Sequence, residues 1–360
     1  MFLLLHITLT MTYNKKSNTA MLYPLLFRNN FFSKIWGGSL LKRLKGINDG
    51  DTTPIGESWE ISAVPGKESV VGNGSLQGRK LNELVKEYKE ELIGRTVYDM
   101  YGETFPLLIK FIDAAKDLSI QVHPNDEMAR KYHDSFGKTE MWYIMDTKPG
   151  AKLYSGFKSL ISKYEYEKRI EDGSICDVLA SYDVNAGDVF YIPSGRIHAI
   201  CSGTLVAEVQ QSSDLTYRIF DYNRPGLDGK PRELHTALAA EALDYKVEDD
   251  YRTHYTHKMN YPVLLAGNRF FMVKLLEVNR AFHRKLYKYD SFVVYMCLDG
   301  SCDIVVRSWK GEEPEVKQVH LTKGMSCLVP ACVADMDVVP NNEDRTSKLL
   351  EVYIDNKNYK

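Results

Sequence analysis

The feature that most constrains the fold is a succession of short apolar or alternating segments, separated by glycine, proline, asparagine or aspartate. Segments of this length and pattern are typical of β-strands. Repeated at short intervals, they predict a β-sandwich or barrel. The clearest examples are PLLIKFID, EMWYIMD, DVFYIP, GTLVAEVQQ, FMVKLLEV, FVVYMCL, CDIVVRSW and KLLEVYI.

Helical patterns are fewer. Apolar residues at helical spacing predict a helix in LNELVKEYKEELIG, a helix, a break and a second helix in SLISKYEYEKRIEDGSICDVLA, and a helix in RELHTALAAEAL. No apolar run reaches the length needed to span a bilayer. We therefore expect a mainly β protein with a few helices.

The first twenty residues, MFLLLHITLTMTYNKKSNTA, contain a short apolar run. The run lacks the basic lead-in and the small-residue cleavage pattern of a secretory signal. We interpret residues 1–20 as a disordered extension or an overlong start, and a weak signal peptide is the less favoured alternative.

Charge and cysteine content exclude several function classes. The formal net charge of the 360 residues is -2, so no global positive field attracts nucleic acid or an anionic membrane. None of the six cysteines forms a C-x-x-C pair, and most lie in apolar runs. This usage is typical of a reducing compartment, and we expect a cytoplasmic protein that is a monomer or a homodimer.

One internal similarity predicts a duplicated unit. GDVFYIPSGRIHAI, from Gly187, and GMSCLVPACVADMD, from Gly324, both read as glycine, strand, proline and strand. Such a repeat favours two β-barrels in tandem, although glycine-strand-proline is also a common hairpin pattern. The second copy carries Asp335 in place of His198, and a rough alignment puts Phe292 in place of Glu140. If both barrels form, only the first has metal ligands.

A candidate metal site comes from three β-segments. In LSIQVHPNDE, Gln121 and His123 stand two apart and share one face of a strand. Glu140 opens the strand EMWYIM, and His198 follows Pro193 by five residues. Nitrogen and oxygen ligands without thiolate suit Zn²⁺, Fe²⁺ or Mn²⁺ in an open catalytic site.

Taken singly, each of these four residues is more often a core or surface residue than a ligand. Their combination and order are more specific than any one of them. Six other histidines have no comparable setting, and we expect surface or helix positions for them: His133, His235, His254, His257, His283 and His320.

The motifs LSIQVHPND, KTEMWYI, YIPSGRIHAI and DLTYRIFDYNRPGLDGKPRELH, supported by IGESWEISAVPG and KIWGG, resemble those of type I mannose-6-phosphate isomerases. The similarity covers roughly residues 22–355 and is closest to the short bacterial form. It implies tandem cupin (jelly-roll) barrels, of which only the first binds metal, and one zinc ion per chain. The implied ligands are Gln121, His123, Glu140 and His198.

The same resemblance implies a catalytic domain at 21–245, with helical segments, and a metal-free cupin domain at 246–360. The substrate would be a small sugar phosphate. Mannose 6-phosphate and fructose 6-phosphate would interconvert through an enediol. A bound cation, a base and a phosphate-binding group are the elements that this chemistry requires.

Three residues are candidates for catalysis. Arg218 resembles the family's arginine beside the metal and would bind substrate or steady the enediolate. Lys138 shares the face of Glu140 and is a candidate acid or oxygen ligand. Glu208, among apolar residues, is a candidate base with a raised pKa. Metal-bound water is the competing base, and a surface position is the alternative for Arg218 and Lys138.

Four residues are candidates for substrate binding. Ser119, Lys110 and Arg224 resemble the family's phosphate-binding group, and Arg224 stands where the long forms carry a lysine. Trp36 is a candidate wall of the pocket, with core burial as an equal alternative. An iron-dependent cupin oxidase and a non-catalytic sugar-binding cupin remain rival classes. The cationic residues speak against the first, and the full ligand set speaks against the second.

Overall fold

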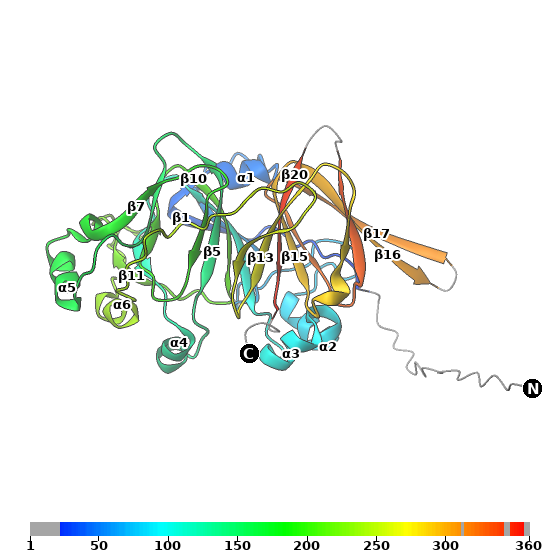
Figure 1. Cartoon of the computed structure of the whole chain (residues 1–360), viewed down its shortest axis with the longest axis horizontal. Coiled ribbons are helices and arrows are strands. Elements are labelled where there is room, and N and C mark those ends of the chain that lie inside the picture. Colours follow the sequence, from blue (N-terminus) through cyan, green and yellow to red (C-terminus); the bar gives the residue numbers. More distant parts are fainter. Residues whose placement is uncertain (1–21, 311–312, 342–345, 356–360) are drawn as a thin grey trace, which may run out of the picture.

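The computed structural model describes residues 22–310, 313–341 and 346–355, so the extension expected at 1–20 lies outside it. The strands form two β-sandwiches that lie side by side along the long axis of the molecule (Figure 1). The prediction of a mainly β chain with tandem jelly-roll units is confirmed. Within the described residues no strand pairing joins the two sheets of a sandwich, so each unit is open and not a closed barrel.

The first sandwich is built from two antiparallel sheets. Its six-stranded sheet has the order β1 (Phe31–Gly38), β2 (Ile55–Ile61), β3 (Leu107–Ala114), β10 (Thr204–Gln211), β5 (Glu140–Thr147) and β8 (Val189–Ile192). Its five-stranded sheet has the order β11 (Tyr217–Phe220), β4 (Ile120–Val122), β9 (His198–Ile200), β6 (Lys152–Phe157) and β7 (Leu179–Asp183).

The second sandwich repeats this plan. Its five-stranded sheet has the order β12 (Val263–Gly267), β13 (Met272–Val278), β20 (Ser347–Tyr353), β15 (Val293–Asp299) and β18 (Ser326–Val329). Its four-stranded sheet has the order β14 (Phe282–Lys285), β19 (Asp335–Pro340), β16 (Ser301–Lys310) and β17 (Glu313–Thr322). The order β2-β3-β10-β5-β8 thus matches β12-β13-β20-β15-β18, as the predicted duplication requires.

The rough alignment of the two copies was wrong by one residue. Glu140 pairs with Ile192, which directly precedes Pro193. Val293 pairs with Val329, which directly precedes the matching Pro330. Val293, not Phe292, therefore stands at the position of Glu140. An apolar residue still replaces the carboxylate there.

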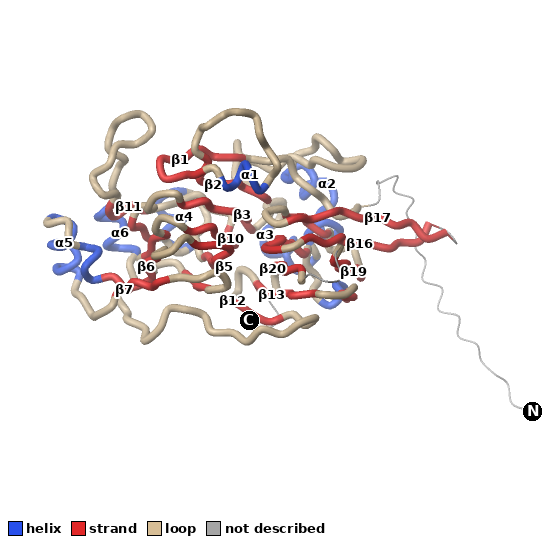
Figure 2. Tube along the Cα trace, turned by 90° about the horizontal axis from the view of Figure 1, so that it is seen from above, coloured by secondary structure: helices blue, strands red, loops and turns tan. Residues whose placement is uncertain are grey.

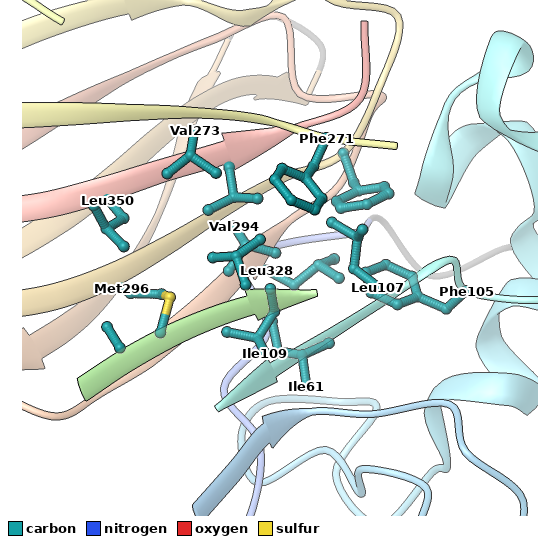
Figure 3. Close-up of a cluster of buried hydrophobic side chains, with 14 of the residues drawn as sticks. Ile61, Phe105, Leu107, Ile109, Phe271, Val273, Val294, Met296, Leu328 and Leu350 are labelled. Atoms are coloured by element: carbon teal, nitrogen blue, oxygen red, sulfur yellow. The ribbon is translucent and has the colours of Figure 1, made fainter. Parts of the chain in front are cut away.

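The central strands of the six-stranded sheet are buried on both faces, which explains why they read as nearly continuous apolar runs. In β10, Leu205, Ala207 and Val209 face the second sandwich and join a core that includes Val294 and Leu350 (Figure 3). The alternate residues of the same strand point into the first sandwich. Figure 3 shows how the side chains of the two facing sheets interdigitate.

The helices are α1 (Leu40–Leu44), α2 (Leu81–Ile93), α3 (Arg95–Tyr101), α4 (Asp126–His133), α5 (Lys163–Glu171) and α6 (Thr236–Ala242), with 3₁₀ turns η1 (Ile175–Val178) and η2 (Leu286–Lys288). The expected helices are confirmed as α2, α5 and α6, whereas the second helix expected after α5 is a short 3₁₀ turn, η1, that leads into β7. We did not anticipate α1, α3 and α4. In the described part of the chain no helix has the length and apolarity needed to cross a membrane.

Helices α5 and α6 cover one end of the molecule (Figure 1). Apolar side chains of α5 and α6 pack against the five-stranded sheet of the first sandwich, at the end opposite β16 and β17 (Figure 2). The end of α2 contacts the second sandwich, where the backbone N–H of Phe292 donates to the carbonyl of Ile93 at 3.2 Å. Leu25 also pairs with Leu328. Segments from the N-terminal part of the chain therefore contribute contacts to the second sandwich.

Candidate active site

Three strands of the first sandwich bring the predicted ligands together. Gln121 in β4 and His198 in β9 are direct cross-strand partners. His123 lies just beyond the end of β4, on the same side as Gln121. Glu140 opens β5 in the facing sheet. The site thus lies between the two sheets of this sandwich.

The ligand atoms converge. Glu140 Oε2 lies 3.4 Å from Nε2 of His123, and Glu140 Oε1 lies 3.4 Å from Nε2 of His198. The side-chain nitrogen of Gln121 lies 3.2 Å from Nε2 of His198. In the residues that the structure describes, His123, Glu140 and His198 are the one group of at least three histidine, cysteine or acidic side chains with metal-binding proximity.

Backbone carbonyls fix the orientation of both imidazoles. Nδ1 of His123 lies 2.9 Å from the carbonyl oxygen of Leu215, and Nδ1 of His198 lies 2.8 Å from that of Arg196. A carbonyl only accepts hydrogen bonds, so each Nδ1 carries the proton. Each Nε2 then presents a lone pair toward Glu140. This arrangement is usual around metal-binding histidines.

The charge states suit a cation. Burial lowers the pKa of His123 to about 3, assisted by the charge of Lys138, and burial also lowers the pKa of His198. Both rings are therefore neutral near pH 7. Burial opposes ionisation of Glu140, but the positive charge of Lys138 and the interactions with His123 and His198 together lower the pKa of that carboxyl.

These side chains are buried, and several of their inward-facing polar atoms lack hydrogen-bond partners. Nε2 of His123 and both carboxylate oxygens of Glu140 have no hydrogen-bond partner among the described residues. The exposed fractions of His123, Glu140 and His198 are 1%, 0% and 0%. Buried acceptors are rarely left without partners, and a cation is the partner that would satisfy all of them.

A cavity of about 230 Å³ adjoins this group. It is lined by seven of the predicted site residues, namely Trp36, Lys110, Ser119, Gln121, Lys138, Glu208 and Arg218. Two of these connect the cavity to the ligands. Gln121 contacts His198, and Nζ of Lys138 lies 3.1 Å from Glu140 Oε2.

Glu208 lies in β10, an interior strand of the six-stranded sheet. Its Oε1 lies 3.1 Å from Nζ of Lys110, and its Oε2 accepts a hydrogen bond of 2.9 Å from Nε1 of Trp142. Burial raises the pKa of Glu208, although the charge of Lys110 opposes the shift. Trp142 also packs edge-on against His198, with ring centroids 5.2 Å apart.

The structure does not bring Arg224 to the cavity. Its guanidinium binds Asp221, with Nη2 donating to Oδ1 at 2.9 Å. The cavity is instead lined by Lys34, Arg232 and His235, which sequence reasoning missed. Lys34 stands two residues before Trp36, so strand spacing was a usable signal. Arg232 and His235 lie in the quoted motif KPRELH, but nothing in its pattern indicates which side chains turn inward.

Comparison with known proteins gives the family. Residues 25–154 match the family described as "Phosphomannose isomerase type I, catalytic domain". ManA of Bacillus subtilis (strain 168), a mannose-6-phosphate isomerase, is 42% identical over 225 residues, which cover 61% of this chain and 68% of that protein. The crystal structure of a mannose 6-phosphate isomerase from Bacillus subtilis superposes with a TM-score of 0.79 at 33% identity, covering 92% of this chain and 99% of that one.

The chain belongs to the type I mannose-6-phosphate isomerase family. It is therefore an enzyme, of the aldose–ketose isomerase class. The apo mannose 6-phosphate isomerase from Salmonella typhimurium shares the fold at a TM-score of 0.70 and 16% identity, covering 93% of this chain and all of that one (100%). The tandem sandwiches are thus a property of this isomerase fold and not of one sequence.

Proposed function

We propose that this chain is a zinc-dependent enzyme that interconverts mannose 6-phosphate and fructose 6-phosphate through an enediol intermediate. The observation that carries the proposal is a buried His–Glu–His group in which Nε2 of His123 and both Glu140 oxygens have no hydrogen-bond partner among the described residues, beside a cavity rich in cationic side chains. Family membership supports the substrate. The donor set of imidazole and carboxylate fits zinc.

The metal would be held by Nε2 of His123, Nε2 of His198 and the carboxylate of Glu140. Gln121 would join through Oε1, once its amide has turned so that oxygen replaces the nitrogen now near His198. Zinc there would polarise the sugar carbonyl and stabilise negative charge on oxygen.

Proton transfer between C1 and C2 needs a base inside the cavity. We assign this role to Glu208, because its buried carboxyl has a raised pKa and lines the cavity. Lys110 and Trp142 hold it in place. A base with a raised pKa takes a proton more readily near neutral pH than an exposed glutamate.

Arg218 and Lys138 would act on the oxygens. Arg218 stands opposite Gln121 in the β11–β4 pair, and its Nη1 donates to the carbonyl of Glu233 at 2.9 Å. Its buried Nε has no partner among the described residues. It is therefore available to an enediolate oxygen. Lys138 is held by Glu140 and lines the same cavity, where it would steady a hydroxyl.

Ser119, Lys110 and Trp36 would shape the pocket around the sugar. Ser119 directly precedes β4 and shares the inward face of Gln121. Trp36 is 4% exposed and packs with Ile112 and Leu118 in the core that borders the cavity. Its indole would exclude water from the reacting carbons.

Isomerisation in D₂O tests the reaction. An enediol formed by a protein base should bring solvent deuterium into fructose 6-phosphate or into recovered mannose 6-phosphate. Turnover with no deuterium in either sugar, even after prolonged incubation, would indicate a direct hydride shift. Glucose 6-phosphate serves as the control substrate, since it differs from mannose 6-phosphate at C2 alone.

A further inference from the structure

The segment after β11 returns alongside it. The backbone N–H of His235 donates to the carbonyl of Arg218 at 2.7 Å, and the N–H of Arg218 donates to Nδ1 of His235 at 3.2 Å. β11 is the edge strand beside β4, so residues 232–235 lie on the free side of β11. Gln121, Arg218 and Arg232 are thus carried by three neighbouring segments, and all three line the cavity.

Asp221 anchors this segment. Its carboxylate is 5% exposed and accepts hydrogen bonds from Nε of Arg232 at 2.7 Å and from Nη2 of Arg232 at 2.5 Å. Arg224 binds the same carboxylate from the other side. Of these two arginines, only Arg232 lines the cavity. Asp221 leaves Nη1 of Arg232 unused, and no hydrogen bond within the described residues engages that group.

The positive charge of the cavity is only partly compensated at this edge. Elsewhere along the cavity, a lysine lies beside a carboxylate: Lys110 beside Glu208 and Lys138 beside Glu140. At β11, Arg224 and Arg232 share the carboxylate of Asp221. The guanidinium of Arg218 donates to a backbone carbonyl and has no carboxylate partner among the described residues. Burial lowers the pKa of Arg218, and the charge of Arg232 lowers it further.

We propose that Arg232, held in place by Asp221, binds the phosphate of the sugar phosphate substrate, beyond the end of the sugar that Arg218 would contact. A phosphate dianion would relieve the repulsion between the two guanidinium groups and accept paired hydrogen bonds. The segment of Arg232 lies two strand spacings, about 10 Å, from that of Gln121. This separation suits a hexose phosphate whose carbonyl end faces the metal ligands. The inference rests on the proposed function and gives Arg232 the role expected of Arg224.

Kinetics of three variants test the assignment. Arg232→Gln should raise KM for mannose 6-phosphate about tenfold or more, since hydrogen bonds to charged groups are among the strongest, and should change kcat little. Arg224→Gln is the matched control, because it removes the other arginine from Asp221, and its KM should stay within about twofold of wild type. Asp221→Asn should raise KM with kcat retained, as expected of a positioning residue.

If Arg232 only stabilises the loop, Arg224→Gln and Arg232→Gln should raise KM equally, and this result would overturn the inference. A wild-type KM in Arg232→Gln would overturn it as well. Calorimetric titration with inorganic phosphate separates this question from catalysis. Binding that is lost in Arg232→Gln and kept in Arg224→Gln supports the phosphate site even in a preparation without isomerase activity. Equal phosphate affinity in both variants contradicts it.

Discussion

Glu351 occupies in the second sandwich the position that Glu208 occupies in the first. Glu208 in β10 stands opposite Lys110 of β3. Glu351 in β20 stands opposite Lys274 of β13, at the matching place in the sheet order. The duplicated fold has therefore kept a buried glutamate and a facing lysine in both copies.

The partner on the other side is an aromatic donor in both cases. Trp142 stands opposite Glu208 and donates through Nε1 at 2.9 Å. Tyr295 stands opposite Glu351 and donates through its hydroxyl at 2.8 Å. An aromatic N–H or O–H thus satisfies one carboxylate oxygen in each sandwich.

The two glutamates differ in what else binds them. The carboxylate of Glu351 also accepts hydrogen bonds from Nε of Arg284 at 2.7 Å and from its Nη2 at 2.6 Å. The hydroxyl of Tyr289 donates to it at 3.2 Å. No arginine contacts Glu208 within the described residues, and Glu208 lines a cavity. Glu351 is therefore held as a structural group, whereas Glu208 has capacity to accept a proton.

Loss of Arg284 should unfold the second sandwich more easily. Arg284→Ala leaves Glu351 buried without its main partner, and we expect a loss of about 3–5 kcal/mol in the free energy of unfolding. Arg307→Ala is the control, because the Arg307–Asp337 pair is exposed and should contribute less than about 1 kcal/mol. Urea unfolding measures both. Equal small losses would show that the Glu351 pair is not a stabilising feature.

Glu208→Gln should keep the metal and lower kcat by about 10²-fold or more, as expected for loss of a general base. A base works only when deprotonated, so the wild-type rate should fall as pH drops through the raised pKa of Glu208, above the usual glutamate range. The variant should lack this acidic limb. The test is a pH profile of kcat for both proteins, and an unchanged profile in Glu208→Gln would assign the base elsewhere.

Most strands and the grouping of His123, Glu140 and His198 could be predicted from sequence, because apolar periodicity and the motifs around these residues are local signals. The one-residue error at Phe292 arose because a strand has a period of two, so a small slip exchanges its faces. The place of Arg224 and Arg232 could not be predicted. Their side chains turn according to Asp221, a contact that depends on how the loop folds back on β11.

Arg218→Ala should keep zinc and lose about 10²–10³-fold in kcat, if its guanidinium stabilises the enediolate. Arg218→Lys should not restore the rate, because an ammonium lacks the paired donors of a guanidinium. Steady-state kinetics in both directions, with metal content measured on the same preparation, decide the matter. A raised KM with normal kcat would limit Arg218 to phosphate binding.

Metal content and isomerase activity, measured together on wild type and His198→Ala, test the central claim most directly. We expect about one zinc ion per chain in the wild type, loss of activity on chelation, and its return with zinc. His198→Ala should stay folded, since the second sandwich has its own core, and should lose both metal and activity. Full activity in metal-free wild type, or unchanged metal content in folded His198→Ala, would contradict the account.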